Sequence, residues 1–439
     1  MWNYHPALLA RPVPRYTSYP TAAEFGDSVG HADMAIALDA IGAEERVSLY
    51  IHIPYCREIC WYCGCNTGAA NRTGRLAAYL DRLDEEIDLL VDRLGGRGRV
   101  GRIAFGGGSP NAIPTTAFAS LVERVVTRLR CGDPVLSVEI DPRGFDAEWA
   151  AVLEATGTTR VSLGVQTFDP AIQAGIGRVQ PGEDIERTVE LLRRAGVSSI
   201  NFDLMYGLPG QDEVSLAATL ETALAIAPDR LAVFGYAHVP HMIPRQRRID
   251  ASALPDAAAR FAQAAQAHET LTGAGYRAIG FDHFARPGDA IAQAVDDGTL
   301  RRNFQGFTED PAEVLIGLGA SSISAFPDRL LQNEKNTGRY HLAIGAGRFA
   351  TSRGLLRTAE DRVRGSAITS ILTSGAADLS DIPGFEGIRA RLAPFEDEGL
   401  LDWQGRRVTL AGAALPYARA IAATLDAYRQ EGHRFSSAV

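Results

Sequence analysis

The sequence predicts an α/β fold in which parallel strands and helices alternate to form a partial, open β/α barrel. Between residues 47 and 236, six strand-like segments alternate with helix-like segments, and this alternation requires parallel strands joined by right-handed crossovers. In the segment 199–206, Ser199, Asn201 and Asp203 fall on one face and apolar residues fall on the other. A closed eight-stranded barrel is filled by bulky apolar side chains, so this polar inner face predicts a wider, incomplete barrel that holds a polar ligand.

The individual elements are expected from hydrophobic periodicity and from the residues that interrupt it. The stretch 15–21 comes before them and is polar and aromatic with proline on both sides, which favours an irregular segment over a helix. Strands are expected at 47–53, 101–105, 136–140, 160–166, 199–206 and 230–236. Helices are expected at 75–94, 115–129, 147–155, 182–195 and 213–227. Beyond residue 240 the alternation loosens into a helix at 255–274, a strand at 276–281 and an apolar, glycine-rich segment at 313–324.

The last part of the chain predicts a small, mainly α-helical, winged-helix-like domain. Helices at 360–373 and 388–398 precede a hairpin across Gln404-Gly405, and a final helix completes the unit. We therefore divide the chain into three parts. These are an N-terminal arm at 1–45 that covers the active site, a catalytic partial-barrel domain with its C-terminal extension at 46–350, and the C-terminal domain at 351–439.

The composition excludes several classes of protein. A chain of 439 residues with 46% hydrophobic residues can bury a large core. The net charge of −9 argues against a nucleic-acid binder, which needs a basic face. No apolar run is long enough to cross a bilayer, and the N-terminus lacks the charged-then-apolar pattern of a signal peptide. We therefore expect a cytoplasmic protein without nucleic-acid or membrane partners, and we expect it to be a monomer.

Four of the five cysteines fall within ten residues, on the loop after the first strand. Soft thiolates this close together favour an iron–sulfur cluster or zinc over a disulfide framework. Structural zinc usually requires two separated Cys-x2-Cys pairs, and Cys131 stands alone downstream. Only one residue separates Cys63 from Cys65, which makes it difficult for both to bind the same cluster. The easier ligand set therefore consists of Cys56, Cys60 and Cys63. Three thiolates on a four-iron cluster would leave one iron open to a non-protein ligand, while zinc and merely reactive or buried thiols remain alternatives.

Polar or glycine residues end several of the predicted strands. The second ends in Gly106-Gly107-Gly108-Ser109, and the next ones end in Glu139, Gln166 and Asp203. Because the carboxyl ends of parallel strands form the usual binding edge of such folds, these residues predict a ligand site there. For each residue alone a structural hydrogen bond is an alternative, and the glycines fit a plain tight turn equally well.

The spacing Cys56-x3-Cys60-x2-Cys63 after the first strand, with the glycine-rich end of the second, resembles the radical S-adenosylmethionine (SAM) superfamily. Within it, the chain resembles the oxygen-independent coproporphyrinogen III oxidase family from about Arg15 to Tyr340. The segments that carry this narrower resemblance are Cys63-Gly64-Cys65-Asn66, 15–21, Glu139-Ile140-Asp141-Pro142-Arg143, Gly164-Val165-Gln166, Tyr206-Gly207-Leu208-Pro209, 282–287 and 301–307.

The resemblance implies a 4Fe–4S cluster on Cys56, Cys60 and Cys63, with SAM on the fourth iron and a second SAM molecule beside it. It implies that a 5′-deoxyadenosyl radical removes a hydrogen from a propionate side chain of coproporphyrinogen III, after which carbon dioxide and one electron leave. Two such events give protoporphyrinogen IX in haem biosynthesis. An electron donor of the flavodoxin or ferredoxin type is implied as a partner. No catalytic side chain is assigned, because the radical comes from the cofactor.

The resemblance also assigns the residues that contact SAM. They are Tyr50, Tyr62, Gly107, Gly108, Ser109, Glu139, Gln166, Arg178, Asp203, Ala237 and Ile323. The candidates for binding the substrate carboxylates are Arg15, Arg286, Arg301 and Arg302, since arginine pairs with carboxylates through two parallel hydrogen bonds. Two alternatives on the same scaffold are a haem-binding chaperone and a radical SAM methyltransferase. The chaperone typically lacks the second cysteine of Cys63-x-Cys65 and the Arg-Tyr-Thr stretch at 15–17, and both are present here.

Overall fold

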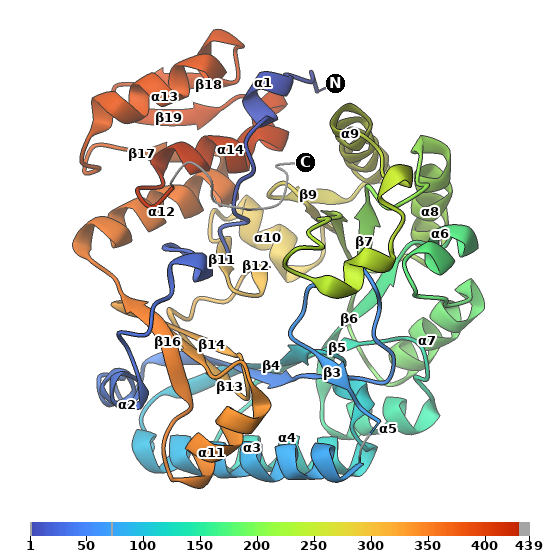
Figure 1. The fold of residues 1–439 in the computed structure, drawn as a ribbon, viewed down its shortest axis with the longest axis vertical. Coiled ribbons are helices and arrows are strands. Elements are labelled where there is room, and N and C mark those ends of the chain that lie inside the picture. The colour runs from blue at the N-terminus through green and yellow to red at the C-terminus, as the bar shows by residue number, and fades with distance from the viewer. Residues whose placement is uncertain (1, 72, 430–439) are drawn as a thin grey trace.

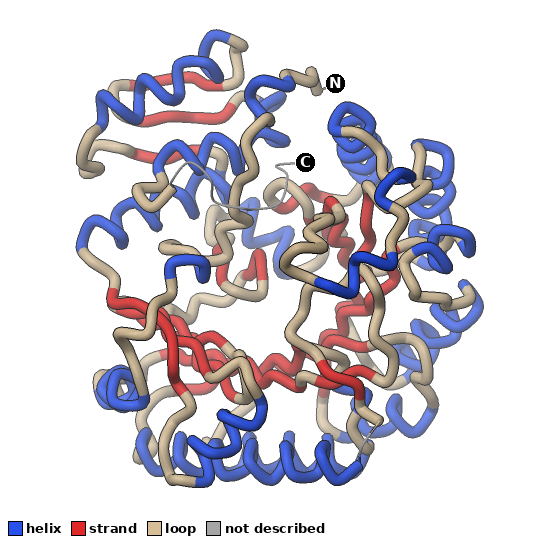
Figure 2. Tube along the Cα trace, in the orientation of Figure 1, coloured by secondary structure: helices blue, strands red, loops and turns tan. Residues whose placement is uncertain are grey.

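The computed structural model describes residues 2–71 and 73–429, and its centre is an open, strongly curved sheet (Figures 1 and 2). In these residues the sheet has twelve strands in the order β16-β15-β14-β13-β1-β4-β5-β6-β7-β8-β10-β9. The strands from β13 to β8 in this order are parallel. Their bounds are β1 (Arg46–Ile53), β4 (Arg99–Gly107), β5 (Val135–Ile140), β6 (Thr158–Gln166), β7 (Ser199–Tyr206), β8 (Arg230–Gly235) and β13 (Val314–Leu318).

Helices connect the parallel strands and cover the outer side of the curved sheet (Figure 1). They are α3 (Thr73–Leu94), α4 (Thr115–Arg128), α5 (Ala147–Ala155), α6 (Pro170–Gly175), α7 (Gly182–Arg194) and α8 (Glu213–Ile226). The alternation predicted between residues 47 and 236 is therefore confirmed, with α6 as an additional short helix. The alternation along β7 is also confirmed, because Ile200, Phe202 and Leu204 are fully buried in the core while Ser199, Asn201 and Asp203 line the inner cavity.

The two ends of the sheet do not pair with each other, so the barrel is open as predicted. At one edge, β14 (Ile323–Phe326), β15 (Arg329–Asn333) and β16 (Thr351–Leu356) are antiparallel, with α11 (Thr337–Gly345) between the last two. At the other edge, β10 (His283–Ala285) pairs antiparallel with both β8 and β9 (Arg277–Ile279). Nearby elements are α9 (Ala257–Gly273), α10 (Ala290–Asp296), the hairpin β11 (Arg301–Asn303) and β12 (Gly306–Thr308), and the 3-10 helices η3 (Pro244–Arg248) and η4 (Ala251–Ala253).

The N-terminal arm contains short helices around an irregular centre. Residues 15–21 form neither helix nor strand, as predicted. The flanking elements α1 (Pro6–Leu9), η1 (Ala22–Glu24) and α2 (His31–Asp39) were not predicted. In α2 a carboxylate oxygen of Asp33 accepts a hydrogen bond from Gly30 N at 2.8 Å, and Met34 and Leu38 are buried against the main core. Leu9, Val13, Tyr16 and Tyr19 pack instead into the core of the C-terminal domain, so the arm ties the two parts together.

The C-terminal domain has the predicted helices and hairpin. It comprises α12 (Ala359–Ser374), β17 (Ala376–Asp378), α13 (Phe385–Asp397), β18 (Leu401–Gln404), β19 (Arg407–Leu410), η5 (Gly412–Tyr417), α14 (Ala418–Ala422) and η6 (Ala423–Leu425). The three strands form a small sheet in the order β17-β19-β18. The large sheet continues through β16 and so runs past residue 350, where the sequence places the boundary. No helix in the described ranges has the length and apolar character needed to span a membrane.

Candidate active site

The cysteine loop follows β1 at the carboxyl end of the parallel strands. It begins with β2 (Tyr55–Cys56), which pairs with β3 (Gly68–Ala69) and holds the loop across the strand ends. All four thiols of the loop are free: Cys60 is buried, Cys56 and Cys63 are partly buried, and Cys65 is the most exposed. The Trp61 amide donates to the Ile176 carbonyl at 3.1 Å, which fixes the middle of the loop.

Two arginines contact the buried thiol. Arg143 Nη2 and Arg178 Nη1 each lie 3.3 Å from Cys60 Sγ. Both arginines also pair with Asp141, at 2.7 Å and 3.1 Å respectively. Burial opposes ionisation of Asp141, but the charge of Arg178 and the hydrogen bonds from Arg143 outweigh it, so the pKa of Asp141 is lowered. A thiolate at Cys60 therefore has two charged hydrogen-bond donors in place.

The loop fits a four-iron cluster better than a single metal ion. No group of three or more His, Cys, Asp or Glu side chains converges as around one ion in residues 2–71 and 73–429. The cysteines of an iron–sulfur cluster bind different irons, so their thiolates need not converge on one point. Cys63 is prepared for such a role, because a hydrogen bond from Cys65 lowers the pKa of its thiol to about 6. The donor set of soft thiolates, two of them supported by hydrogen bonds, fits the cluster.

The glycine-rich end of β4 allows close packing at the strand ends. A Cβ at Gly106 would lie 2.6 Å from the carboxyl carbon of Glu139, and a Cβ at Gly108 would overlap the Tyr55 carbonyl. Gly107 has φ +108°, and its N–H donates to Glu139 Oε2 at 3.1 Å. The glycines are therefore more than a plain turn, since only residues without a side chain let Glu139 and the cysteine loop lie this close.

Glu139 and Asp203 place two carboxyl groups on the inner face of the barrel. The Glu139 side chain faces the cavity and is accessible from it, yet its depth in the barrel raises its pKa to about 7. Burial also raises the pKa of Asp203, which accepts hydrogen bonds from Ser162 Oγ at 3.0 Å and Asn201 Nδ2 at 2.9 Å. Carboxylates held in this way are stabilised when a cationic ligand approaches.

The other positions assigned to SAM also gather at the carboxyl ends of the strands. Tyr50 pairs with Gly317 across β1 and β13, and a Cβ at Gly317 would lie 2.6 Å from the Ile323 carbonyl oxygen. Ser109 Oγ accepts a hydrogen bond from the Asp141 amide at 3.2 Å. Gln166 ends β6 with a left-handed φ of +67°, and Arg178 Nε donates to the neighbouring Gly164 carbonyl at 3.1 Å.

Gln246 is a residue of this region that the sequence did not reveal. It is almost fully buried in η3, and its Nε2 donates to the carbonyl oxygens of Tyr62 at 2.9 Å and Ala237 at 3.0 Å. It thereby joins the cysteine loop to the segment after β8. Gln246 lies among several arginines, a composition typical of an exposed segment, so no pattern in the sequence indicates that it is buried.

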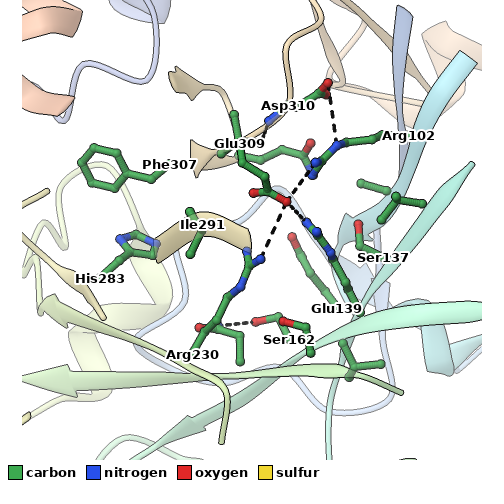
Figure 3. Close-up of a pocket in the computed structure, with 18 of the residues that line it drawn as sticks. Arg102, Ser137, Glu139, Ser162, Arg230, His283, Ile291, Phe307, Glu309 and Asp310 are labelled. Atoms are coloured by element: carbon green, nitrogen blue, oxygen red, sulfur yellow. Dashed lines mark hydrogen bonds and ion pairs between the residues drawn. The ribbon is translucent and has the colours of Figure 1, made fainter. Parts of the chain in front are cut away.

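At the opposite, amino-terminal ends of the strands, the cavity of about 380 Å³ ends in an ion cluster (Figure 3). Arg102 on β4, Arg160 on β6 and Arg230 on β8 converge on the carboxylate of Glu309, with Arg102 at 2.9 Å. Burial alone would raise the pKa of Glu309, but the three arginines lower it to about 2. This part of the polar inner face is neutralised within the protein, so it serves the fold rather than a ligand.

Of the four arginines predicted to bind the substrate carboxylates, the structure places two together and two apart. Arg15 and Arg302 lie together, because Arg302 Nη2 donates to the Arg15 carbonyl at 3.1 Å. Arg286 is exposed and donates to the Ala227 carbonyl, before the start of β8 and away from the cysteine loop. Arg301 is exposed and faces Glu313 at 3.8 Å. Only Arg15 and Arg302 are therefore brought to one site.

Comparison with known proteins agrees with this geometry. The model of the radical SAM superfamily matches residues 50–223, and with the open barrel and its cysteine loop it defines a radical SAM enzyme. The chain is 42% identical to the oxygen-independent coproporphyrinogen III oxidase of Bradyrhizobium diazoefficiens, covering 97% of this chain and 96% of the relative. It is 40% identical to that of Pseudomonas aeruginosa, covering 94% and 93%. The chain therefore belongs to the oxygen-independent coproporphyrinogen III oxidase family.

A solved structure supports the same assignment. The coproporphyrinogen III oxidase of Escherichia coli, a radical SAM enzyme, superposes with a TM-score of 0.91 at 34% identity, covering 98% of this chain and 100% of that one. Membership of the superfamily implies SAM and a 4Fe–4S cluster as cofactors.

Proposed function

We propose that this protein converts coproporphyrinogen III to protoporphyrinogen IX without oxygen, turning two propionate side chains into vinyl groups with loss of carbon dioxide from each. The observation that carries the proposal is the family relationship over nearly the whole chain, combined with a cysteine loop that faces a polar inner barrel. The same family relationship favours this reaction over the two alternatives, a haem chaperone and a methyltransferase.

We further propose Cys56, Cys60 and Cys63 as the cluster ligands. Their spacing, the two arginines on Cys60 and the lowered pKa of Cys63 support this set. Cys65 has the role of a hydrogen-bond donor instead, because its N–H lies 3.4 Å from Cys63 Sγ.

SAM is proposed to bind across the strand ends beside this loop. The residues that would hold it are Tyr50, Tyr62, Gly107, Gly108, Ser109, Glu139, Gln166, Arg178, Asp203, Ala237 and Ile323. The resemblance that assigns these residues divides them between two SAM molecules. When bound, the two cofactors supply the electron and the carbon radical that removes a hydrogen atom from the propionate. The chain's own residues orient the ligands: Glu139 and Asp203 offer carboxylates to cationic groups, and the glycines of β4 allow close approach.

The remaining features of the proposal concern partners and location. A flavodoxin- or ferredoxin-type protein would deliver single electrons, and the enzyme would act as a cytoplasmic monomer without nucleic-acid or membrane partners. The arm would cover the active site, which is supported by the hydrogen bond from Arg15 Nη2 to the Gly235 carbonyl at the end of β8.

The test is an anaerobic assay of the reconstituted enzyme with reductant, SAM and coproporphyrinogen III. We expect protoporphyrin after oxidation of the products, together with 5′-deoxyadenosine, and neither with Cys56→Ala. Absence of protoporphyrin from fully reconstituted enzyme would overturn the proposal. Tight stoichiometric haem binding would then indicate the chaperone, and formation of S-adenosylhomocysteine would indicate the methyltransferase.

A further inference from the structure

Four arginines from separate elements gather beside the carboxyl ends of β7 and β8. We call them the arginine cluster: Arg15 of the arm, Arg260 of α9, Arg302 of β11 and Arg419 of α14. Along the chain, two of the three intervals between them exceed 100 residues and the third, from Arg260 to Arg302, is 42, so the fold alone brings them together. Each is partly or fully buried, and Arg419 is only 8% exposed.

Shared neighbours define the geometry of the cluster. Arg302 and Arg419 both stand over the ring of Phe281, with Cζ at 5.2 Å and 5.7 Å from its centre. Arg302 Nη2 donates to the Arg15 carbonyl at 3.1 Å.

Arg15 and Arg260 meet at the end of β8. Arg15 Nη2 donates to the Gly235 carbonyl at 3.1 Å, and a Cβ at Gly235 would lie 3.2 Å from Arg260 Nη2. Arg260 also stands over the ring of Tyr206 at 5.8 Å. The four guanidinium groups are therefore within one another's electrostatic reach.

Positive charge is concentrated at the arginine cluster, where the charge of Arg15 lowers the pKa of the other three guanidinium groups. Burial and the positive charge of Arg15 together lower the pKa of Arg302 to about 10 and that of Arg419 to about 10. Asp282 is the carboxylate that opposes this effect, and it is already bonded to His283 Nδ1 at 2.6 Å. Arg302 Nη1 is buried without a hydrogen-bond partner in the part of the chain that the structure describes. A buried guanidinium with an unsatisfied donor, such as that of Arg302, is costly unless an anion binds to it.

The cluster is separated from the inner cavity by single aromatic rings. Arg15 stands over Phe234 at 5.2 Å, and Arg302 stands over Phe307 at 4.3 Å. Both rings line the cavity into which Glu139 and Asp203 project, and His283 packs between them at 5.4 Å from each. Figure 3 shows His283 and Phe307 on one side of this cavity. A ligand held by the arginines would thus extend toward the strand ends.

We propose that the arginine cluster binds the propionate carboxylates of the tetrapyrrole that are not reacting, and so points a reacting propionate toward the SAM site. This inference rests on the proposed function for the identity of the substrate. Arginine suits the task because its planar guanidinium pairs with a carboxylate through two parallel hydrogen bonds and also stacks on flat rings. Arg286 and Arg301, which the sequence also suggested, have no part in it.

The test measures binding of coproporphyrin III, the oxidised form with the same four propionates, to cluster-reconstituted enzyme by fluorescence. Deuteroporphyrin IX, with two propionates, serves as the comparison ligand. Loss of one charged hydrogen-bonded pair should weaken coproporphyrin III binding by about 10- to 100-fold in Arg302→Gln or Arg419→Gln, with a smaller effect on deuteroporphyrin IX. Arg194→Gln, an exposed change on α7, is the matched control.

Further measurements separate binding from folding. SAM cleavage to 5′-deoxyadenosine without substrate and the iron–sulfur absorbance should stay at wild-type levels, while the KM for coproporphyrinogen III rises. If a glutamine variant does not fold, Arg15→Gln and Arg302→Lys carry the test, because Arg15 is on the arm and lysine keeps the charge but loses the planar fork. Unchanged affinity in folded variants of an enzyme that still makes protoporphyrin would overturn this inference alone. If binding depends on these arginines but no protoporphyrin is formed, the inference of a carboxylate-binding site would stand and the proposed reaction would be rejected.

Discussion

Replacing Glu309 with glutamine should destabilise the barrel without changing its shape. Glu309 and its neighbours Asp310 and Asp289 face Arg102, Arg160 and Arg230, so three carboxylates oppose three guanidinium groups. The Glu309 side chain is only 9% exposed, and its oxygens make these contacts as ion pairs without well-aligned hydrogen bonds. Glu309→Gln keeps the volume but leaves one buried positive charge without compensation.

The magnitude follows from the pKa of Glu309. A shift from 4.5 to about 2 corresponds to about 3 kcal/mol of unfolding free energy at neutral pH. The unfolding entropy of a chain of this length makes about 1 kcal/mol equivalent to about 1 °C in Tm, so the Tm should fall by about 3 °C. Because the folded pKa is depressed, this stabilisation is fully present above pH 4.5 and is lost as the pH falls toward 2.

The assay is thermal unfolding followed by circular dichroism at several pH values. Glu313→Gln is the matched control, because the Glu313 side chain is 68% exposed and its contact with Arg301 is long, so it should shift the Tm by less than about 1 °C. The reasoning is refuted if Glu309→Gln melts with the wild type at pH 7, or if its deficit grows rather than shrinks as the solution is acidified below pH 4.5.

Three further predictions concern the active site. After anaerobic reconstitution, the iron–sulfur absorbance should be lost in each of the variants Cys56→Ala, Cys60→Ala and Cys63→Ala. Cys65→Ala should keep most of this absorbance, and an equal loss in all four variants would indicate that Cys65 is also a ligand. Arg143→Gln removes a positive donor from Cys60 Sγ, so the reduced cluster loses stabilisation and its potential should fall by on the order of tens of millivolts in an EPR-monitored titration. Arg187→Gln, an exposed change on α7, should leave that potential unchanged, and an equal shift in both would contradict the assignment. Gln246→Leu leaves the buried carbonyls of Tyr62 and Ala237 without their shared donor, so SAM should bind about tenfold more weakly in calorimetry. Gln293→Leu on the exposed face of α10 should bind SAM normally, and a normal affinity for Gln246→Leu would contradict the bridging role.

The fold could be predicted wherever local patterns decide it. Helix α5 has the bounds 147–155 that its periodicity indicates, and the alternation along β7 gave the polar inner face correctly. The order of the strands could not be predicted in this way, because periodicity indicates where strands lie but not which strands pair. For example, β1 pairs with β13, which lies far along the chain. The short helix α2 escaped prediction because its apolar residues are not confined to one face, as the exposed Ile36 shows, and its buried face is defined only by the core that it packs against.

The substrate region shows why the site was only partly predictable. Arg301 and Arg302 are adjacent in β11, so they point to opposite sides, and the sequence does not indicate which side is inward. Only Arg302 meets Arg15. Arg260 and Arg419 lie on helices whose other residues are largely apolar or small. A single arginine in such a helix is predicted to be on the surface. Their role depends on packing between distant elements, and no local pattern contains that information.

The polar inner face of the barrel has two parts, which differ in whether other groups of the protein compensate their charges. At the amino-terminal ends of the strands, Arg230 and its neighbours are matched by Glu309, and ligand binding there would first have to break these pairs. At the carboxyl ends, burial raises the pKa of Glu139 and Asp203, so these groups gain from a cationic ligand such as the sulfonium and amino groups of SAM. The arginine cluster beyond them has the opposite charge and so favours the carboxylates of a tetrapyrrole. On the proposed function, the inner face thus stabilises the barrel at one end and binds a cationic cofactor at the other, while the arginine cluster, behind the rings of Phe234 and Phe307, binds the anionic substrate.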